Sequence, residues 1–268
     1  MIETELLRDP AWLWQRIRDE ALELSRGEPM LASFFHTSLL NHRSLASALG
    51  FLLASQLGSS DVPAMLLRQV CDDAHAAEPA LAAAAAADIC AHYDRDPACV
   101  HYATPMLYFK GFHAVQAYRI AHWLWRGERR SLALFMQHRM AAVYEVDIHP
   151  AAQLGRGIRV DHATGVVIGE TARIGDDVSM LHSVSLGGCG RIQGPRHPVV
   201  DDGVLISAGA KLLGPVRIGA GAKIAAGSVV LADVPARTTV AGVPAQAVGR
   251  AAGAEPPALE MDQGLGDR

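Results

Sequence analysis

Histidines with neighbouring carboxylates are the residues of this chain that could support acid–base chemistry. The sequence contains 12 histidines, and an unperturbed imidazole titrates near neutral pH, so it can take a proton from an attacking alcohol. His162 lies beside Asp161 in the segment Val-Asp-His-Ala-Thr-Gly, and Asp147 lies upstream. An aspartate bonded to one ring nitrogen of such a base fixes its tautomer and stabilises the imidazolium. By residue type alone, His162 and Asp147 could instead be surface residues on turns.

A segment rich in glycine and proline supplies the second candidate group. Between Leu186 and Ile206 the sequence reads GGCGRIQGPRHPVVDDGVL, which places Arg196 next to His197. An arginine fork can bind a carboxylate through two parallel hydrogen bonds, and loops on a rigid scaffold often carry functional residues. We therefore expect a loop that binds an anionic group. Cys189 lies in the same segment, but no pattern around it indicates a nucleophile, and we predict no role for it.

The composition excludes several classes of protein. The 268 residues carry a formal net charge of -4 at pH 7, without the Lys/Arg excess that nucleic-acid binding needs. No apolar run of about 18 residues and no basic-then-apolar N-terminus occur, so we expect neither a membrane span nor a signal peptide. Four scattered cysteines indicate reduced thiols and therefore a cytoplasmic protein. No dinucleotide-binding or P-loop glycine pattern is present.

The first half of the chain predicts helices. Only five glycines precede residue 146, whereas seventeen lie between Gly155 and Gly249. Prolines mark the starts of helices, and apolar residues follow them at helical spacing. We expect an all-helical domain over residues 1–145, with helices that start near Pro10, Pro63 and Pro79 and two more over Gly111–Trp125 and Ser131–Tyr144.

The second half repeats every six residues. One aliphatic side chain recurs at this period, often followed by a small residue, which is typical of a parallel β-helix in which each short strand supplies one inward side chain. We place one eight-residue step after Val166 and an extruded loop between Leu186 and Ile206. The α+β prediction is therefore a helical domain followed by a β-helix over residues 146–250. The inward residues are Ile148, Leu154, Val160, Val166, Ile174, Met180, Leu186, Ile206, Leu212, Ile218, Ile224 and Val230.

Several segments together carry a family resemblance. In the second half these are VDIHPAAQLGRGIRVDHATGVVIGET (146–171), the GPRHP loop and TTVAGVPAQAVG (238–249). In the first half they are GEPMLASFFHTSLLNH (27–42), DRDPAC (94–99) and TPMLYFKGFHAVQAYRIAHWLW (104–125). Over about residues 10–250 the chain resembles the serine acetyltransferases, which are hexapeptide-repeat acyltransferases. The resemblance implies a left-handed β-helix, an exception to the usual right-handed crossover. It also implies acetyl transfer from acetyl-CoA to the hydroxyl of L-serine, the first step of cysteine biosynthesis from serine.

The same resemblance assigns roles to single residues. It implies His162 as the general base and Asp147 as its partner carboxylate. Serine is a zwitterion, so its carboxylate would bind Arg196 and His197, and its ammonium would bind carboxylates. The matched carboxylates are Asp96 and Asp161, although an Asp-Pro pair such as Asp96-Pro97 is also a common helix N-cap. For acetyl-CoA the resemblance implies a groove between coils that includes Gly188, Ala208, Ala226 and Pro244. Lys223 and Arg250 could meet the nucleotide phosphates.

Partners follow from the resemblance in the same way. It implies feedback inhibition by L-cysteine, no metal, and a homo-oligomer that is a trimer or a dimer of trimers. We expect residues 251–268 to form a flexible tail, because they are rich in Gly, Pro and acids. Family tails often end in an isoleucine that binds O-acetylserine sulfhydrylase. This chain ends in Arg268, whose guanidinium would be desolvated in an apolar pocket, so we expect weak binding to that enzyme.

Three other functions compete with this one. An acetyltransferase for homoserine, a sugar or an antibiotic would use the same scaffold. A zinc hydratase of the carbonic anhydrase type also uses such a coil, and enough histidines are present to supply its ligands, namely His149, His162, His182 and His197. A scaffold that only assembles partners would show no activity that depends on CoA.

Overall fold

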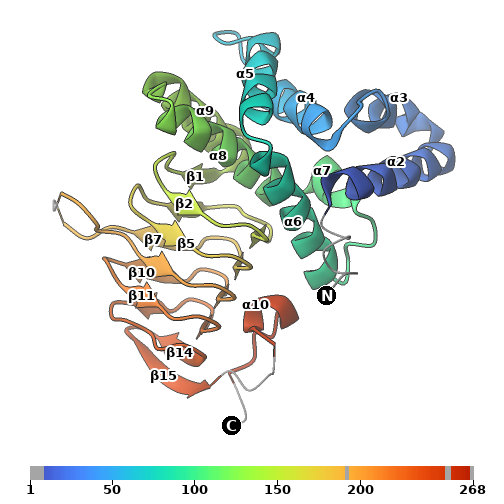
Figure 1. Ribbon diagram of the computed structural model, residues 1–268. Coiled ribbons are helices and arrows are strands. Elements are labelled where there is room, and N and C mark those ends of the chain that lie inside the picture. The colour runs from blue at the N-terminus through green and yellow to red at the C-terminus, as the bar shows by residue number, and fades with distance from the viewer. Residues whose placement is uncertain (1–8, 191–192, 251–254, 266–268) are drawn as a thin grey trace.

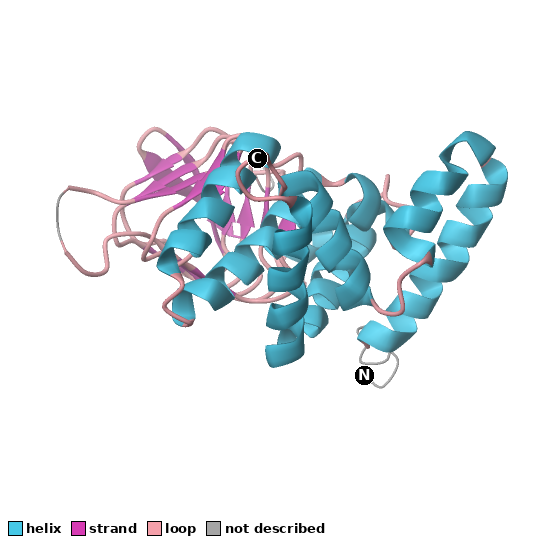
Figure 2. Ribbon diagram, turned by 90° about the horizontal axis from the view of Figure 1, so that it is seen from above, coloured by secondary structure: helices cyan, strands magenta, loops and turns pink. Residues whose placement is uncertain are grey.

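The computed structural model describes residues 9–190, 193–250 and 255–265. A cap of helices lies over one end of a column of stacked β-coils, and the extruded loop projects from the column on the side away from the C-terminal helix (Figure 1). Viewed from above, the loop points away from the helical domain (Figure 2). The predicted α+β architecture, with helices followed by a parallel β-helix, is confirmed.

The helical domain contains the predicted helices and several that the sequence analysis missed. Asp9 caps the first described helix, since its carboxylate accepts a hydrogen bond from the Ala11 amide at 3.1 Å. The missed α4 is buried along most of its length, and a helix that is apolar all round shows no amphipathic period. The helical elements are α2 (Pro10–Gly27), η1 (Pro29–Leu31), α3 (Ala32–Phe35), η2 (His36–Leu40), α4 (Leu45–Leu57), α5 (Ala64–Ala77), α6 (Ala80–Arg95), α7 (Ala103–Tyr108), α8 (Lys110–Arg126) and α9 (Arg130–Tyr144).

The coil is a triangular prism whose faces are three sheets. From β1 to β13 every third strand pairs in parallel with the strand one coil away, and in the regular coils residues 18 positions apart, such as Lys211 and Val229, lie opposite each other. The last strand, β15, pairs antiparallel with β14. Sheet A contains β1 (Val146–Ile148), β4 (Val166–Ile168), β7 (Ser185–Gly187), β10 (Lys211–Leu213) and β13 (Val229–Val230). Sheet B contains β2 (Gln153–Leu154), β5 (Arg173–Ile174), β8 (Val199–Val200) and β11 (Arg217–Ile218). Sheet C contains β3 (Arg159–Val160), β6 (Ser179–Met180), β9 (Leu205–Ile206), β12 (Lys223–Ile224), β14 (Thr238–Gly242) and β15 (Ala245–Arg250).

The predicted inward residues form the core of the coil, with two corrections to their register. Ile168, not Val166, stacks between Ile148 and Leu186. Val166 and Ile168 are both buried, so the sequence alone did not show which of them stacks in the core. The extra two residues therefore lie before β4 rather than after it. The repeat also resumes earlier than predicted, because Val200 is buried and pairs with both neighbouring strands of sheet B.

Two edges of the prism carry most of the predicted site residues. The corners from sheet C to sheet A comprise residues 161–165, 181–184, 207–210 and 225–228, and we call them the histidine edge. The corners from sheet A to sheet B comprise residues 149–152, 169–172, 188–190 with 193–198, and 214–216, and we call them the loop edge. Sheet A separates the two edges.

Buried charges join the helical domain to the coil. Asp88 on α6 is fully buried, and its carboxylate accepts hydrogen bonds from Gln116 at 2.8 Å, from Arg119 at 2.7 Å and from the Ile158 amide of the coil at 2.8 Å. Arg119 also donates to the Gly155 carbonyl at 2.8 Å. These bonds fix the helices against the first coil and so fix where the end of α6 lies.

Part of the predicted tail is packed on the coil. Residues 255–265 contain the short helix α10 (Pro257–Glu260), which lies against sheet C on the same side as α6 (Figure 1). Ala258 is fully buried, and its carbonyl accepts a hydrogen bond from Ser179 Oγ at 2.8 Å. This stretch is therefore folded against the coil, and the flexibility expected for residues 251–268 stays a prediction. Arg268, which the expectation about a sulfhydrylase concerns, lies outside the described residues.

We predict that Asp88→Ala costs about 3–5 kcal/mol of stability, because it leaves the Arg119 guanidinium buried without its carboxylate. Asp72→Ala is the matched control: its partner Arg68 is at 2.8 Å but the pair is partly exposed, so its loss should cost below about 1 kcal/mol. Urea unfolding of both variants and the unaltered protein measures the difference. Equal losses for the two variants would show that the Asp88 network does not hold the domains together.

Candidate active site

His162 lies on an unusual corner of the histidine edge. This corner contains the two extra residues of the first coil, and both His162 and Ala163 have left-handed backbone conformations, with φ of 55° and 63°. Two consecutive non-glycine residues in this region are uncommon, and such strain concentrates at functional sites. The Ala163 side chain is fully buried and anchors the corner, whereas the His162 side chain is 73% exposed. The corner therefore presents the imidazole to solvent.

Two of the predicted carboxylates meet next to this imidazole. Asp161 Oδ2 lies 3.7 Å from His162 Nε2, and Arg159 Nη2 lies 3.3 Å from Asp161 Oδ2 and 3.1 Å from Asp96 Oδ2. Asp96 follows α6, so Arg159 links a carboxylate of the helical domain to one of the coil. Two carboxylates that share one guanidinium leave a net negative charge, which favours a cationic ligand. Sequence analysis missed Arg159, because only the fold places it between Asp96 and Asp161.

A pocket of about 350 Å³ opens beside these groups. Its lining includes Asp96, Asp161 and His162, together with Lys110 and His92. His92 is buried, and neither ring nitrogen has a hydrogen-bond partner among the described residues. Burial, with a smaller effect from Arg159, lowers the pKa of His92 to about 3, so its ring stays neutral. The pocket thus combines a carboxylate pair, an exposed imidazole and an uncharged wall, and sequence analysis did not identify His92.

The loop residues lie on the other edge of the prism. The Arg196 guanidinium pairs with Glu170, and the His197 ring contacts Thr171 Oγ1 at 2.8 Å. Burial and the neighbouring Arg196 lower the pKa of His197, while the Arg196 hydrogen bond lowers the pKa of Glu170. Gly169 lies under the His197 ring, because a Cβ at Gly169 would stand 2.0 Å from Nε2. Glu170, Thr171 and His197 line a different pocket, of about 540 Å³, whose lining does not include His162.

Asp147 does not contact His162 within one chain. It is the middle residue of β1 between two buried residues, so its side chain lies on the outer face of sheet A, where it accepts a hydrogen bond from Gln137 Nε2 at 2.7 Å. Burial lowers the pKa of His149, and the negative charges of Glu170 and Asp147 partly oppose this shift. Asp147 therefore interacts with a residue of the loop edge, whereas the resemblance implied that it is the partner of His162.

The residues proposed for acetyl-CoA do not all lie together. Ala208 and Ala226 occupy the same corner position as His162 in successive coils, since each follows an inward residue of sheet C by two. Gly188 belongs to the loop edge, and Pro244 lies in the β14–β15 connection. Lys223 lies on the outer face of sheet C, where it is buried and its Nζ lies 2.8 Å from Asp262 Oδ2 of the C-terminal segment. Ala208 and Ala226 therefore share the histidine edge with His162, whereas Gly188, Pro244 and Lys223 lie elsewhere.

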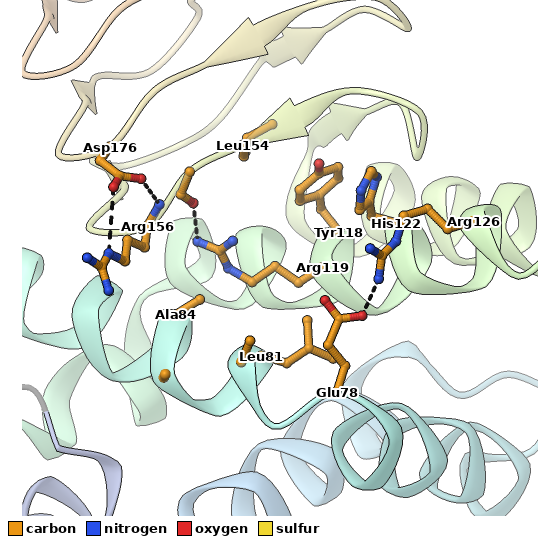
Figure 3. Close-up of a pocket in the computed structure, with 13 residues that line it drawn as sticks. Glu78, Leu81, Ala84, Tyr118, Arg119, His122, Arg126, Leu154, Arg156 and Asp176 are labelled. Carbon is orange, nitrogen blue, oxygen red and sulfur yellow. Dashed lines mark hydrogen bonds and ion pairs between the residues drawn. The ribbon is translucent and has the colours of Figure 1, made fainter.

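A further pocket lies between α6, α8 and the first two coils, and its arginines are engaged in structural bonds (Figure 3). Arg119 donates to the Gly155 carbonyl, Arg126 pairs with Glu78, and Arg156 lies 3.6 Å from Asp176. None of the predicted site residues lines this pocket. It belongs to the interface between the helical domain and the coil.

The histidines do not form a metal site in the described part of the chain. No group of three or more histidine, cysteine or acidic side chains among those residues has the spacing of metal ligands. His162 and His182 approach each other, but His149 packs on Trp125 and His197 bonds to Thr171. The zinc hydratase alternative therefore lacks its ligand set in this part of the chain. No helix among the residues described is long and apolar enough to cross a membrane.

Comparisons with known proteins agree with this architecture. Residues 13–117 match the model of the family described as serine acetyltransferase, N-terminal, and residues 197–232 match the bacterial transferase hexapeptide model. The serine acetyltransferase of Salmonella typhimurium is 56% identical over 251 residues, which are 94% of this chain and 92% of that protein. A crystal structure of serine acetyltransferase from Vibrio cholerae is similar with a TM-score of 0.92 and 54% identity, over 94% of this chain and 97% of the other.

Two other similar structures contain ligands. A serine acetyltransferase in complex with cysteine has a TM-score of 0.92 and 51% identity, over 94% of this chain and 97% of the other. A serine acetyltransferase in complex with CoA has a TM-score of 0.85 and 52% identity, over 88% of this chain and 98% of the other. Neither the cysteine nor the CoA bound to these relatives favours an acetyltransferase for homoserine, a sugar or an antibiotic over one for serine.

Proposed function

Because the chain belongs to the serine acetyltransferase family, an acyltransferase family, we propose that it moves the acetyl group of acetyl-CoA to the hydroxyl of L-serine with His162 as the general base. The observation that supports this most is the position of His162. It is exposed on a strained corner, at the mouth of a pocket whose other walls include two carboxylates. The base and a site for a cationic amino group are thus side by side.

Serine would bind with its ammonium at Asp96 and Asp161. The pair carries two negative charges against the single positive charge of Arg159, so an ammonium restores neutrality. The serine hydroxyl would then face His162, which takes the hydroxyl proton as the oxygen attacks the thioester carbon. General-base catalysis of this kind contributes roughly 10²–10⁴-fold to the rate.

The carboxylate of serine needs a second group, which the histidine edge does not supply. Arg196 and His197 suit it chemically, but they lie on the loop edge, across sheet A, where His197 lines a separate pocket. Glu170 engages Arg196 through Nη2, which leaves other N–H donors of the fork for a carboxylate. We therefore propose that the loop edge of one copy meets the histidine edge of a second copy and that the complete site forms between them.

Sheet A has a surface that suits such a contact. Val167 and Leu213 are exposed on its outer side, at 41% and 37%, and Leu231, which directly follows β13, is 58% exposed. Contacts between two different edges are heterologous, and they close into a ring when the rotation between copies allows it. A trimer built in this way would cover sheet A and bring Asp147 and Arg196 of one copy toward His162 of the next. The predicted dyad of Asp147 and His162 would then form between subunits.

L-cysteine would inhibit by binding in the same pocket. It differs from serine only in sulfur for oxygen, so the carboxylate pair and the arginine would accept it. The solved relative in complex with cysteine supports this proposal. Inhibition constants at several serine concentrations test it: the apparent constant should rise in proportion to serine. Inhibition that serine does not relieve would place the cysteine site elsewhere.

We predict that His162→Ala lowers kcat by about 10²-fold or more while the circular dichroism spectrum is unchanged, because general-base assistance is lost. His138→Ala on the exposed side of α9 is the control for loss of an imidazole. Release of CoA from acetyl-CoA and L-serine measures the rate. A folded His162→Ala variant that keeps above about a tenth of the normal kcat would contradict the assignment.

A further inference from the structure

One buried polar side chain in the wall of the proposed serine pocket takes no part in the proposed acetyl transfer. His92 on α6 lines this pocket together with Asp96 and Asp161, and only 2% of the residue is exposed. Neither ring nitrogen has a hydrogen-bond partner in the described part of the chain. Buried polar groups are nearly always hydrogen-bonded, so an exception requires an explanation. Because His92 lies in the pocket wall, a ligand of the pocket is suited to supply the partner.

The surroundings of His92 keep its ring uncharged. The ring centroid lies 5.5 Å from that of Phe109 and 6.2 Å from that of Phe112, and Phe109 also lines the pocket. Burial, with a smaller effect from Arg159, lowers the pKa of His92 to about 3. A neutral imidazole has one N–H donor and one acceptor nitrogen. His92 is therefore an uncharged acceptor in a pocket whose other acceptors include carboxylates.

The His92 ring can turn without losing a hydrogen bond. Protein atoms cover both nitrogens, so a ligand reaches one of them only when the ring turns. A half-turn about the bond from Cβ to Cγ exchanges the two nitrogens with the two ring carbons and keeps the outline of the ring, and this torsion is roughly two-fold for histidine. No hydrogen bond to the described residues holds the present orientation, and the packing on Phe109 and Phe112 suits either one.

The ammonium of serine has one donor more than the two carboxylates would each take. An ammonium has three N–H donors. Asp96 Oδ1 already accepts a hydrogen bond from the Ala98 amide at 2.9 Å, and Arg159 Nη2 lies 3.1 Å from Asp96 Oδ2 and 3.3 Å from Asp161 Oδ2. Protein groups thus use part of the acceptor capacity of the pair. A third carboxylate would leave excess negative charge, whereas a neutral imidazole adds an acceptor and no charge.

We propose that His92 is a substrate-binding residue that accepts the third N–H of the serine ammonium and so restricts the pocket to primary ammonium groups. A secondary ammonium, as in N-methyl-L-serine, has only two N–H donors, and its methyl group would meet the ring instead. His92 lies four residues before Asp96, about one helical turn, so the end of α6 would contribute two contacts to the substrate. The inference rests on the proposed function, because it takes Asp96 and Asp161 as the ammonium site.

His92→Leu and His92→Gln test the bond, since leucine removes the acceptor and glutamine keeps one. The KM for serine should rise about 10- to 100-fold in His92→Leu, as expected for a hydrogen bond to a charged group, and less than about threefold in His92→Gln. The KM for acetyl-CoA should not change. Calorimetric titration with L-serine should show the same loss of affinity. The melting temperature of His92→Leu should not fall, because leucine replaces a ring without a partner among the described residues.

His113→Leu is the matched control, because His113 is also buried but has a partner. Its Nε2 donates to the Met106 carbonyl at 2.6 Å. His113→Leu should therefore lower the melting temperature, since it leaves that carbonyl unsatisfied, and should leave the KM for serine unchanged. If His92→Leu does not fold, His92→Phe replaces it as an apolar ring of similar shape.

N-methyl-L-serine gives a readout that a purely structural role would not change. The unaltered enzyme should prefer serine by kcat/KM, and His92→Ala, which leaves room for the methyl group, should narrow that preference by about tenfold or more. A serine KM within about threefold of normal in a folded His92→Leu or His92→Phe, or an unchanged preference in His92→Ala, would overturn the role of His92. If His162→Ala is inactive at the same time, the proposed function still holds. An active His162→Ala would overturn the proposed function instead.

Discussion

The stacked register of the coil is the constraint on which the site depends. Successive coils lie about 4.8 Å apart, so a corner residue in one coil stands above its counterpart in the next. This places His162, His182, Ala208 and Ala226 in one line along the histidine edge. A long, extended co-substrate such as acetyl-CoA suits a linear site of this kind. The two extra residues at the first corner are what turn His162 outward from that line.

The helical domain completes this edge by adding charge. Asp96 reaches the coil because buried contacts fix α6 against it, those of Asp88 with Arg119 and the Ile158 amide and those of Arg95 with the coil. Arg159 then bridges Asp96 and Asp161, which holds two like charges close together. The helical domain supplies no general base in the proposed mechanism, but it contributes the Asp96 carboxylate to the proposed site. The arrangement also explains why the site depends on the interface between the domains.

Periodicity predicted the fold well but could not locate contacts between distant residues. The six-residue repeat gave nearly every inward side chain, and it failed at Val166 because Ile168 is equally aliphatic and equally buried. The resemblance named Asp96 and Asp161, yet Arg159 and His92 become visible only once α6 packs on sheet C. Asp147 was expected beside His162 from the resemblance. Asp147 instead bonds to Gln137 on the outer face of sheet A, and Arg196 pairs with Glu170 on the loop edge.

The split between the two edges makes the shared site the central claim, and subunit mixing tests it most directly. His162→Ala and Arg196→Ala would each be inactive alone. When the two are expressed together and assemble at random, about a quarter of the interfaces in a ring would join an intact histidine edge to an intact loop edge. Recovery of about a quarter of the normal serine acetylation rate is the predicted result. No recovery in verified mixed oligomers would show that both residues act within one chain.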